Sequence, residues 1–249
     1  MPNKLNKHAA MLRMAELCQE IREHDHSYYV QAAPTITDLD YDRKLRELTD
    51  LEKEFPELAA RDSPTKRLGD KPLEGLVQVA HRVPMLSIEN TYSEQELREF
   101  FARTEKLLPG ETIEWVVELK VDGVAASILY EEGLLVQAVT RGNGDIGDDI
   151  THNIRTLRGL PQRLLGKKIP KALEVRGEVY MTNADLVTLN ELRTKAGESE
   201  YKNTRNLTAG SIKLLDSKIC AQRKLRFFCH GIGFCDGLQA RDHMDFLQR

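Results

Sequence analysis

The sequence predicts an α+β fold, in which a small helical module precedes an antiparallel-rich domain. Apolar residues recur at helical spacing within residues 1–70, and short β-rich runs separated by turns follow from about Val83. The runs form hairpins and the later helices stand apart, which is typical of α+β rather than of alternating β-α-β units. We expect two domains, residues 1–70 and 71–249.

The first helix is predicted by one apolar stripe, Ala10, Met14, Leu17 and Ile21. Pro34 and its polar neighbours interrupt the helical pattern. A turn there would allow a second helix to return antiparallel to the first.

The second helix is expected to begin after Thr37, a residue type favoured at the N-cap, with Asp38 and Asp40 in its electropositive first turn. Pro56 marks its end. Its apolar face would consist of Leu45, Leu48, Leu51 and Phe55. The glycines and prolines of residues 62–82 then predict an extended connection.

Short β-rich runs predict strands at residues 115–119, 124–130, 134–140, 173–180 and 225–234. Glu132 and Gly133 are expected to form a hairpin turn. One further helix is predicted from near Asn183 and another over residues 205–215. In the helix from near Asn183, Leu186, Leu189 and Leu192 are expected on the inner side.

Composition is that of an ordinary globular protein, with 41% hydrophobic and 30% charged residues. No apolar run approaches membrane-spanning length, and the charged N-terminus does not resemble a secretory signal. The four cysteines form no CxxC pair, which argues against a zinc site or a disulfide scaffold and favours reduced thiols in a cytoplasmic protein. A net charge of −3 gives no general support for nucleic-acid binding, and we interpret the basic residues within 213–226 as solvated surface.

The sharpest chemical feature is Lys120, which the strand prediction places at a strand end, followed by Asp122 and Gly123. A lysine attacks phosphorus only as the neutral amine, which enzymes favour by desolvation or by nearby cations. Asp122 could orient the amine or bind a metal, and Gly123 permits close approach of the backbone. A surface lysine before an Asp-Gly turn is the alternative.

Two later segments carry further polar groups. The glycine-rich residues 140–151 would bring backbone amides close to a nucleotide, with Arg141 reaching its oxygens, although a plain hairpin loop has the same composition. Strand alternation puts Glu174, Arg176 and Glu178 on one face. Burying three charges is costly unless they are paired with one another or bound to a ligand.

Taken together, six segments resemble the NAD⁺-dependent DNA ligases, in the order found in that family. ELKVDG at 118–123 resembles the nucleotide-attachment motif that these ligases share with other covalent nucleotidyltransferases. The Tyr/Asp pattern of residues 28–42 is similar to the family's nicotinamide mononucleotide (NMN) element. The remaining four are HRVPMLSIEN (81–90), TRGNGDIGDDIT (140–151), LEVRGEV (173–179) and NTRNLTAGS (203–211).

The resemblance implies that Lys120, assisted by Asp122, accepts AMP from NAD⁺ in the first step of sealing nicked double-stranded DNA, with Mg²⁺ offsetting phosphate charge. No side chain is assigned as a dedicated metal ligand, and no membrane partner is expected. The nucleotide-binding residues implied are Tyr28, Tyr29, Asp38, Tyr41 and Asp42 for NMN, Ser87 and Ile88 for adenine, Glu178 for ribose, Arg205 for phosphate, together with Glu118, Arg141 and Lys213.

The chain departs from the family pattern at two of these positions. Lys213 stands where an arginine is usual, and Tyr29 stands where histidine is frequent. Two later lysine-bearing strands of the family are not found before Arg249, so the adenylation domain is expected to be C-terminally incomplete and unable to seal nicks alone. The alternatives are a noncatalytic NAD⁺-binding module, an ATP-dependent covalent nucleotidyltransferase, and a structural protein with a chance KxDG.

Overall fold

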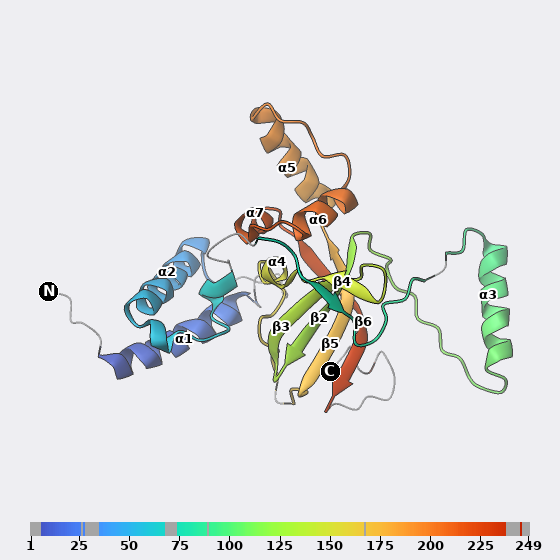
Figure 1. Ribbon diagram of the computed structural model, residues 1–249, viewed down its shortest axis with the longest axis horizontal. Coiled ribbons are helices and arrows are strands. Elements are labelled where there is room, and N and C mark those ends of the chain that lie inside the picture. The colour runs from blue at the N-terminus through green and yellow to red at the C-terminus, as the bar shows by residue number, and fades with distance from the viewer. Residues whose placement is uncertain are drawn as a thin grey trace.

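The computed structural model describes residues 6–25, 27, 35–67, 74–88, 90–166, 168–237 and 245, and it confirms the α+β prediction (Figure 1). The N-terminal part consists of α1 (Lys7–Asp25), α2 (Asp38–Glu54) and the 3-10 turns η2 (Pro56–Leu58) and η3 (Pro64–Arg67). The strands are β1 (Gln78–Ala80), β2 (Val124–Glu131), β3 (Leu134–Thr140), β4 (Ile146–Asp148), β5 (Ala172–Tyr180) and β6 (Arg226–Asp236). The remaining helices are α3 (Glu94–Leu107), α4 (Thr151–Ile154), α5 (Asn183–Lys195), α6 (Thr204–Ile212) and α7 (Ser217–Ala221).

Helices α1 and α2 form a pair with its own core, as the apolar spacing predicts. The predicted stripe is buried, and Leu48 and Leu51 of α2 pack against it. Thr37 caps α2 by accepting a hydrogen bond from the amide of Asp40 at 3.2 Å, and the helix ends before Pro56. The helical pair is therefore specified by local sequence.

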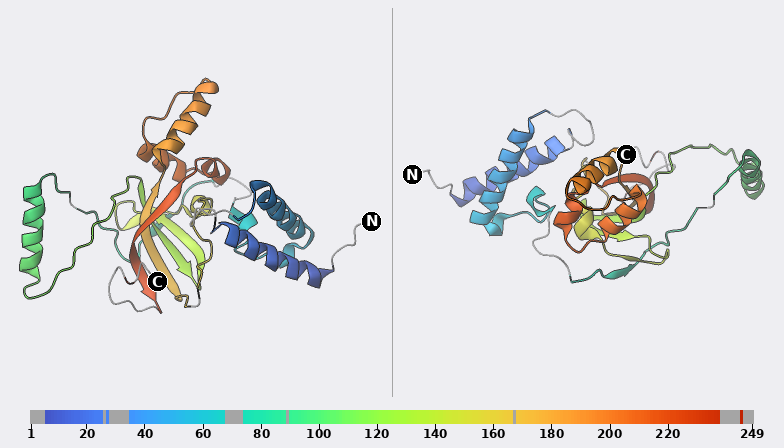
Figure 2. Two further views of the ribbon diagram at one scale, coloured as in Figure 1. Left: turned by 180° about the vertical axis from the view of Figure 1, so that it is seen from behind. Right: turned by 90° about the horizontal axis from the view of Figure 1, so that it is seen from above.

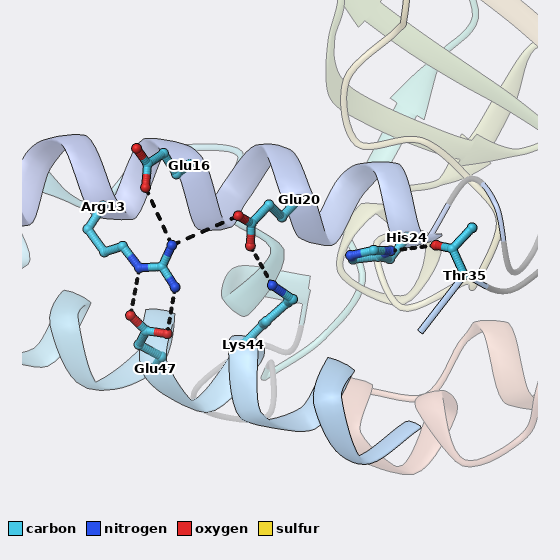
Figure 3. Close-up of polar contacts among 7 residues, drawn as sticks. All are labelled: Arg13, Glu16, Glu20, His24, Thr35, Lys44 and Glu47. Carbon is cyan, nitrogen blue, oxygen red and sulfur yellow. Dashed lines mark hydrogen bonds and ion pairs between the residues drawn. The ribbon is translucent and has the colours of Figure 1, made fainter. Parts of the chain in front are cut away.

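Ion pairs along the edge of the helical pair show the relative direction of α1 and α2. Arg13 donates to both carboxylate oxygens of Glu47 at 2.7 and 2.9 Å, and Lys44 donates to Glu20 at 2.7 Å (Figure 3). Because the later residue of α1 contacts the earlier residue of α2, the two helices run antiparallel. Single pairs at an exposed edge stabilise by less than about 1 kcal/mol, but the two-pronged Arg13 contact also fixes register.

The central sheet is antiparallel, with strand order β3-β2-β5-β6, while β1 pairs separately with β4. Glu132 and Gly133 join β2 to β3 with left-handed φ angles of 48° and 78°, which confirms the predicted two-residue hairpin turn. Buried side chains of α4, α6 and α7 share one core with the sheet (Figure 2). None of the described helices is long and apolar enough to cross a membrane.

Helix α5 extends from the end of the sheet at which α6 and α7 lie (Figure 1). It begins at Asn183 as predicted, because the Thr182 side chain caps it by accepting from the amide of Asp185. Leu186 and Leu189 pack against the main core. The inward placement of Leu192 was wrong: this side chain is 60% exposed, since the outer half of the helix has left the sheet.

The predicted strand at residues 115–119 is also wrong. These residues have no regular secondary structure, and Val117 is 96% exposed. A strand requires a neighbour for its backbone hydrogen bonds, and no other described strand pairs with this segment. Residues 78–80 of the predicted connection, by contrast, pair with β4.

Helix α3 was not predicted, and it stands away from the sheet, on the side opposite to α1 and α2 (Figures 1 and 2). Ser93 caps it by accepting from the amide of Glu96, so the Ser-x-x-Glu capping signal was present in the sequence. The rings of Phe100, Phe101 and Trp115 cluster, with Phe101 and Trp115 centroids 4.5 Å apart.

Candidate active site

The candidate site lies where β2 begins beside the end of β5. Val124 pairs with Val179, so Gly123 lies against the β5 backbone. The Gly123 amide donates to Oε1 of Glu178 at 3.1 Å. A Cβ atom on residue 123 would lie only 2.0 Å from the Val179 carbonyl oxygen, so the contact requires glycine.

Helix α6 brings an arginine to this point. Asn203 caps the helix by accepting from the amide of Asn206, and this cap fixes the first turn, which contains Arg205. The Arg205 guanidinium donates to the carboxylate of Asp122. Both side chains are more than half exposed, so the pair can exchange partners when a ligand enters.

Lys120 itself lies in the irregular segment that leads into β2, and its side chain is exposed. Burial raises the pKa of Glu178, while the amide of Gly123 and the positive charges of Lys120 and Arg205 partly offset this effect. Lys120 lies three residues before Gly123, whose amide donates to Glu178, and Arg205 donates to Asp122 in the same segment. The structure thus brings together four predicted residues: Lys120, Asp122, Glu178 and Arg205.

The 81–88 strip is held against the glycine-rich loop by backbone bonds. The amide of His81 donates to the Asp145 carbonyl at 2.8 Å, and that of Met85 donates to the Gly144 carbonyl at 2.9 Å. The His81 ring nitrogen Nε2 also lies 3.1 Å from the carbonyl oxygens of Thr140 and Arg141. Two segments that are distant in sequence therefore form one wall.

Arg176 fastens the same strip to the sheet. Its guanidinium donates to Glu174 at 3.1 Å, to the Pro84 carbonyl at 2.9 Å and to the Val83 carbonyl at 2.5 Å. Two of the three charges predicted on one face of this strand, Glu174 and Arg176, are thus paired with each other, whereas Glu178 accepts a hydrogen bond from the amide of Gly123. Arg176 and His81 were not assigned a role from sequence, although both belong to the quoted motifs.

Other predicted residues lie around this wall without a common contact. Ser87 and Ile88 are exposed beyond Met85, and Glu118 is exposed beside Lys120. Arg141 is half-buried, and its amide donates to the Ala125 carbonyl. Lys213, also predicted to bind the nucleotide, pairs with Asp148 at 2.8 Å.

The residues predicted to bind NMN are only partly covered. Tyr28 and Tyr29 lie outside the described residues, as does the side chain of Asp38, the first residue of α2. The Tyr41 hydroxyl donates to buried Asp25 at 2.9 Å, and its ring packs on the core of the helical pair. Asp42 is exposed.

No metal cluster is preassembled in the described part of the chain, since no three histidine, cysteine or acidic side chains gather there. All four cysteines are free thiols.

Two family descriptions match the chain. The description "NAD-dependent DNA ligase adenylation domain" matches residues 73–249, and "DNA ligase-like, N-terminal NAD+-binding domain" matches residues 7–69. Together they define a chain in which an NAD⁺-binding domain precedes an adenylation domain.

Similar full-length proteins are DNA ligases. The chain is 54% identical to one from Rhodopirellula baltica, over 95% of this chain and 35% of the relative. It is 47% identical to one from Desulforamulus reducens, over 94% of this chain and 35% of the relative. The chain belongs to the NAD-dependent DNA ligase family, and it spans about a third of the length of these relatives.

Proposed function

We propose that this chain carries out the adenylation step of an NAD⁺-dependent DNA ligase. The lone pair of Lys120 Nζ attacks the AMP phosphorus of NAD⁺, and a P–N bond forms as the P–O bond to the NMN phosphate breaks. NMN leaves with the bonding electron pair, and the amine releases a proton to solvent. AMP then remains on Lys120 as a phosphoramidate.

The observation that supports this proposal best is the convergence of Lys120, Asp122, Glu178 and Arg205 around Gly123. Gly123 keeps the lysine-bearing segment tight against β5, so the amine is held close to a carboxylate that could bind ribose hydroxyls. Arg205 supplies a guanidinium that can transfer from Asp122 to a phosphate, since it binds both groups with the same geometry.

NAD⁺ is the proposed adenylate donor because residues 7–69 match an NAD⁺-binding domain. We assign the NMN half to Tyr28, Tyr29, Asp38, Tyr41 and Asp42. Ser87 and Ile88 would line the adenine pocket, and Glu118, Arg141 and Lys213 would contact the nucleotide. This assignment divides the chain into domains at residues 1–70 and 71–249, acting in the cytoplasm.

Mg²⁺ fits this site as an ion bound chiefly through the substrate. Mg²⁺ is commonly held by one or two carboxylates together with substrate phosphates, and Asp122 offers an exposed carboxylate beside Lys120. When bound, the ion would offset charge on the NAD⁺ phosphates. The chain's own residues still supply the nucleophile and orient it.

Nicked double-stranded DNA is the proposed final substrate of the whole ligase. AMP would pass from Lys120 to the 5′-phosphate at the nick, and the adjacent 3′-hydroxyl would then displace it. Because this chain spans about a third of its relatives' length, we assign it the adenylation step and expect no efficient sealing by these 249 residues alone.

Intact mass spectrometry tests the proposal. The purified chain is incubated with NAD⁺ and Mg²⁺ beside the Lys120→Ala variant, and the wild type is expected to gain one adenylyl group that the variant lacks. A parallel incubation with ATP should give no gain. Adduct formation with ATP alone would identify an ATP-dependent enzyme, and binding of NAD⁺ without any adduct would identify a noncatalytic module.

A further inference from the structure

A second feature lies at the seam between the helical pair and the sheet. Asp62, which follows η2, accepts hydrogen bonds from Nη2 of Arg22 and from Nε of Arg163, each at 2.7 Å. The Asp62 side chain is only 11% exposed. Burial raises its pKa, but the hydrogen bond from Arg163 and the charge of Arg22 outweigh this and lower the pKa overall. The carboxylate therefore stays charged, and both arginines donate to its Oδ2 atom.

Beside Asp62 is a cavity of about 220 Å³. Arg61, Ser63 and Lys66 line it from the helical side, and Arg155 and Gln162 line it from the sheet side. Three of these side chains are cationic, and Asp62, the one acidic residue lining the cavity, is already neutralised by arginines that do not line it. The cavity consequently carries an excess of positive charge.

These three cations have few partners of their own. Among the described residues, Arg61, Lys66 and Arg155 form no ion pair. Within this described part of the chain, the side-chain hydrogen bond of Lys66 goes to the Ala59 carbonyl at 3.5 Å, and that of Arg155 goes to the Leu135 carbonyl at 3.4 Å. Such long contacts leave most of the donor capacity unused. Like charges gathered around one cavity repel each other, so an anion placed among them is favoured.

We propose that this seam cavity binds a phosphate group, which bridges the helical pair and the sheet. Two guanidinium groups and an ammonium group match the oxygens of a phosphate in charge and in donor geometry. The volume is below the range of about 300–1,000 Å³ usual for whole-ligand pockets, so it suits a single phosphate and not an entire nucleotide.

The seam cavity is separate from the adenylation site. It borders the start of β3, beside the turn that ends β2, whereas Gly123 lies just before the other end of β2. Eight residues at about 3.3 Å each put these two ends about 25 Å apart. The phosphate is thus either a free anion or part of a DNA backbone passing the seam, and not the phosphate attacked by Lys120.

Calorimetric titration with inorganic phosphate at constant ionic strength tests the proposal on the whole chain. Saturable binding is expected, and Arg155→Gln should weaken it about tenfold or more, since a hydrogen bond to a charged group contributes that much. Arg61→Gln should act similarly, and because Arg61 is exposed this variant is expected to fold normally. Lys106→Gln, on the exposed face of α3, is the matched control and should bind as the wild type does.

A short intact DNA duplex, added as a competitor, distinguishes the two sources. Displacement of phosphate assigns the site to the DNA backbone, and lack of displacement assigns it to free phosphate; either outcome supports the proposal. Absence of saturable phosphate binding, or equal binding by the wild type and both arginine variants, overturns it. Lys120→Ala should still bind phosphate, and Arg61→Gln should still form the NAD⁺-dependent adduct, so failure of one proposal is distinguishable from failure of the other.

Discussion

Replacing Gly123 by alanine tests how closely the nucleophile depends on strand packing. The new methyl group would lie 2.0 Å from the carbonyl oxygen of Val179, whereas Cβ contacts below 3.0 Å are essentially never seen. The first residues of β2 would therefore have to move away from β5 by about 1 Å. The obstacle is backbone, which cannot rotate aside as a flexible side chain would.

The size of the effect follows from this displacement. Overpacking of this kind costs about 1–3 kcal/mol, and the Gly123–Glu178 hydrogen bond of 3.1 Å would be stretched as well. We expect a loss of about 2 kcal/mol in the free energy of unfolding. Because Lys120 is three residues away on the same segment, its misplacement by about 1 Å should slow adenylation about 10²-fold.

The assay combines urea unfolding with the initial rate of adduct formation from NAD⁺, measured by intact mass. Gly75→Ala is the matched control, because nothing lies within 4 Å of a Cβ built there, and it should leave both quantities close to wild type. A Gly123→Ala variant that adenylates within about threefold of the wild-type rate would refute the proposed dependence on position.

Two further predictions concern ionisable groups. Burial raises the pKa of Glu178 above its ordinary value of 4.5, so the contribution of Glu178 to stability falls as the pH rises from 4.5 through the raised pKa. Glu178→Gln should remove this fall, which urea unfolding of the variant and the wild type across that pH window would measure. The same pH dependence of stability in both proteins would contradict the prediction. The pKa of Asp62 is below its ordinary value of 3.8, so its contribution is present above pH 3.8 and is lost as the pH falls through the lowered pKa. Asp62→Asn should therefore cost about 2 kcal/mol at neutral pH in thermal unfolding, with a smaller difference in acid, and an unchanged melting temperature at neutral pH would refute this.

Much of the fold could be predicted because its signals are local. The β-rich runs of β2 and β3 and the turn at Glu132 and Gly133 are contained within 17 residues, and the Thr37 cap and Pro56 delimit α2. The strand predicted at residues 115–119 lacked such support. Its β-rich composition is real, but a strand also needs a paired neighbour, which composition does not supply.

The candidate site was predicted less completely than the fold. Asp122, Glu178 and Arg205 could be proposed from the sequence because each belongs to a short motif, and the structure shows how β5 and α6 bring them to the segment that carries Lys120. The role of Arg176 could not be predicted from its motif, because its partners, the carbonyls of Val83 and Pro84, lie about 90 residues earlier and show no side-chain signal. The seam cations were missed for the same reason: Arg61 and Arg155 meet only in the folded chain.

Peptide mapping of the NAD⁺-treated chain tests the central claim most directly. The chain is digested after incubation with NAD⁺ and Mg²⁺, and the adenylyl group is located by tandem mass spectrometry. The mechanism predicts a single modified residue, Lys120, with the bond cleaved by acid as a phosphoramidate is. An adenylyl group on another lysine, with Lys120 unmodified, would contradict the assignment of the nucleophile.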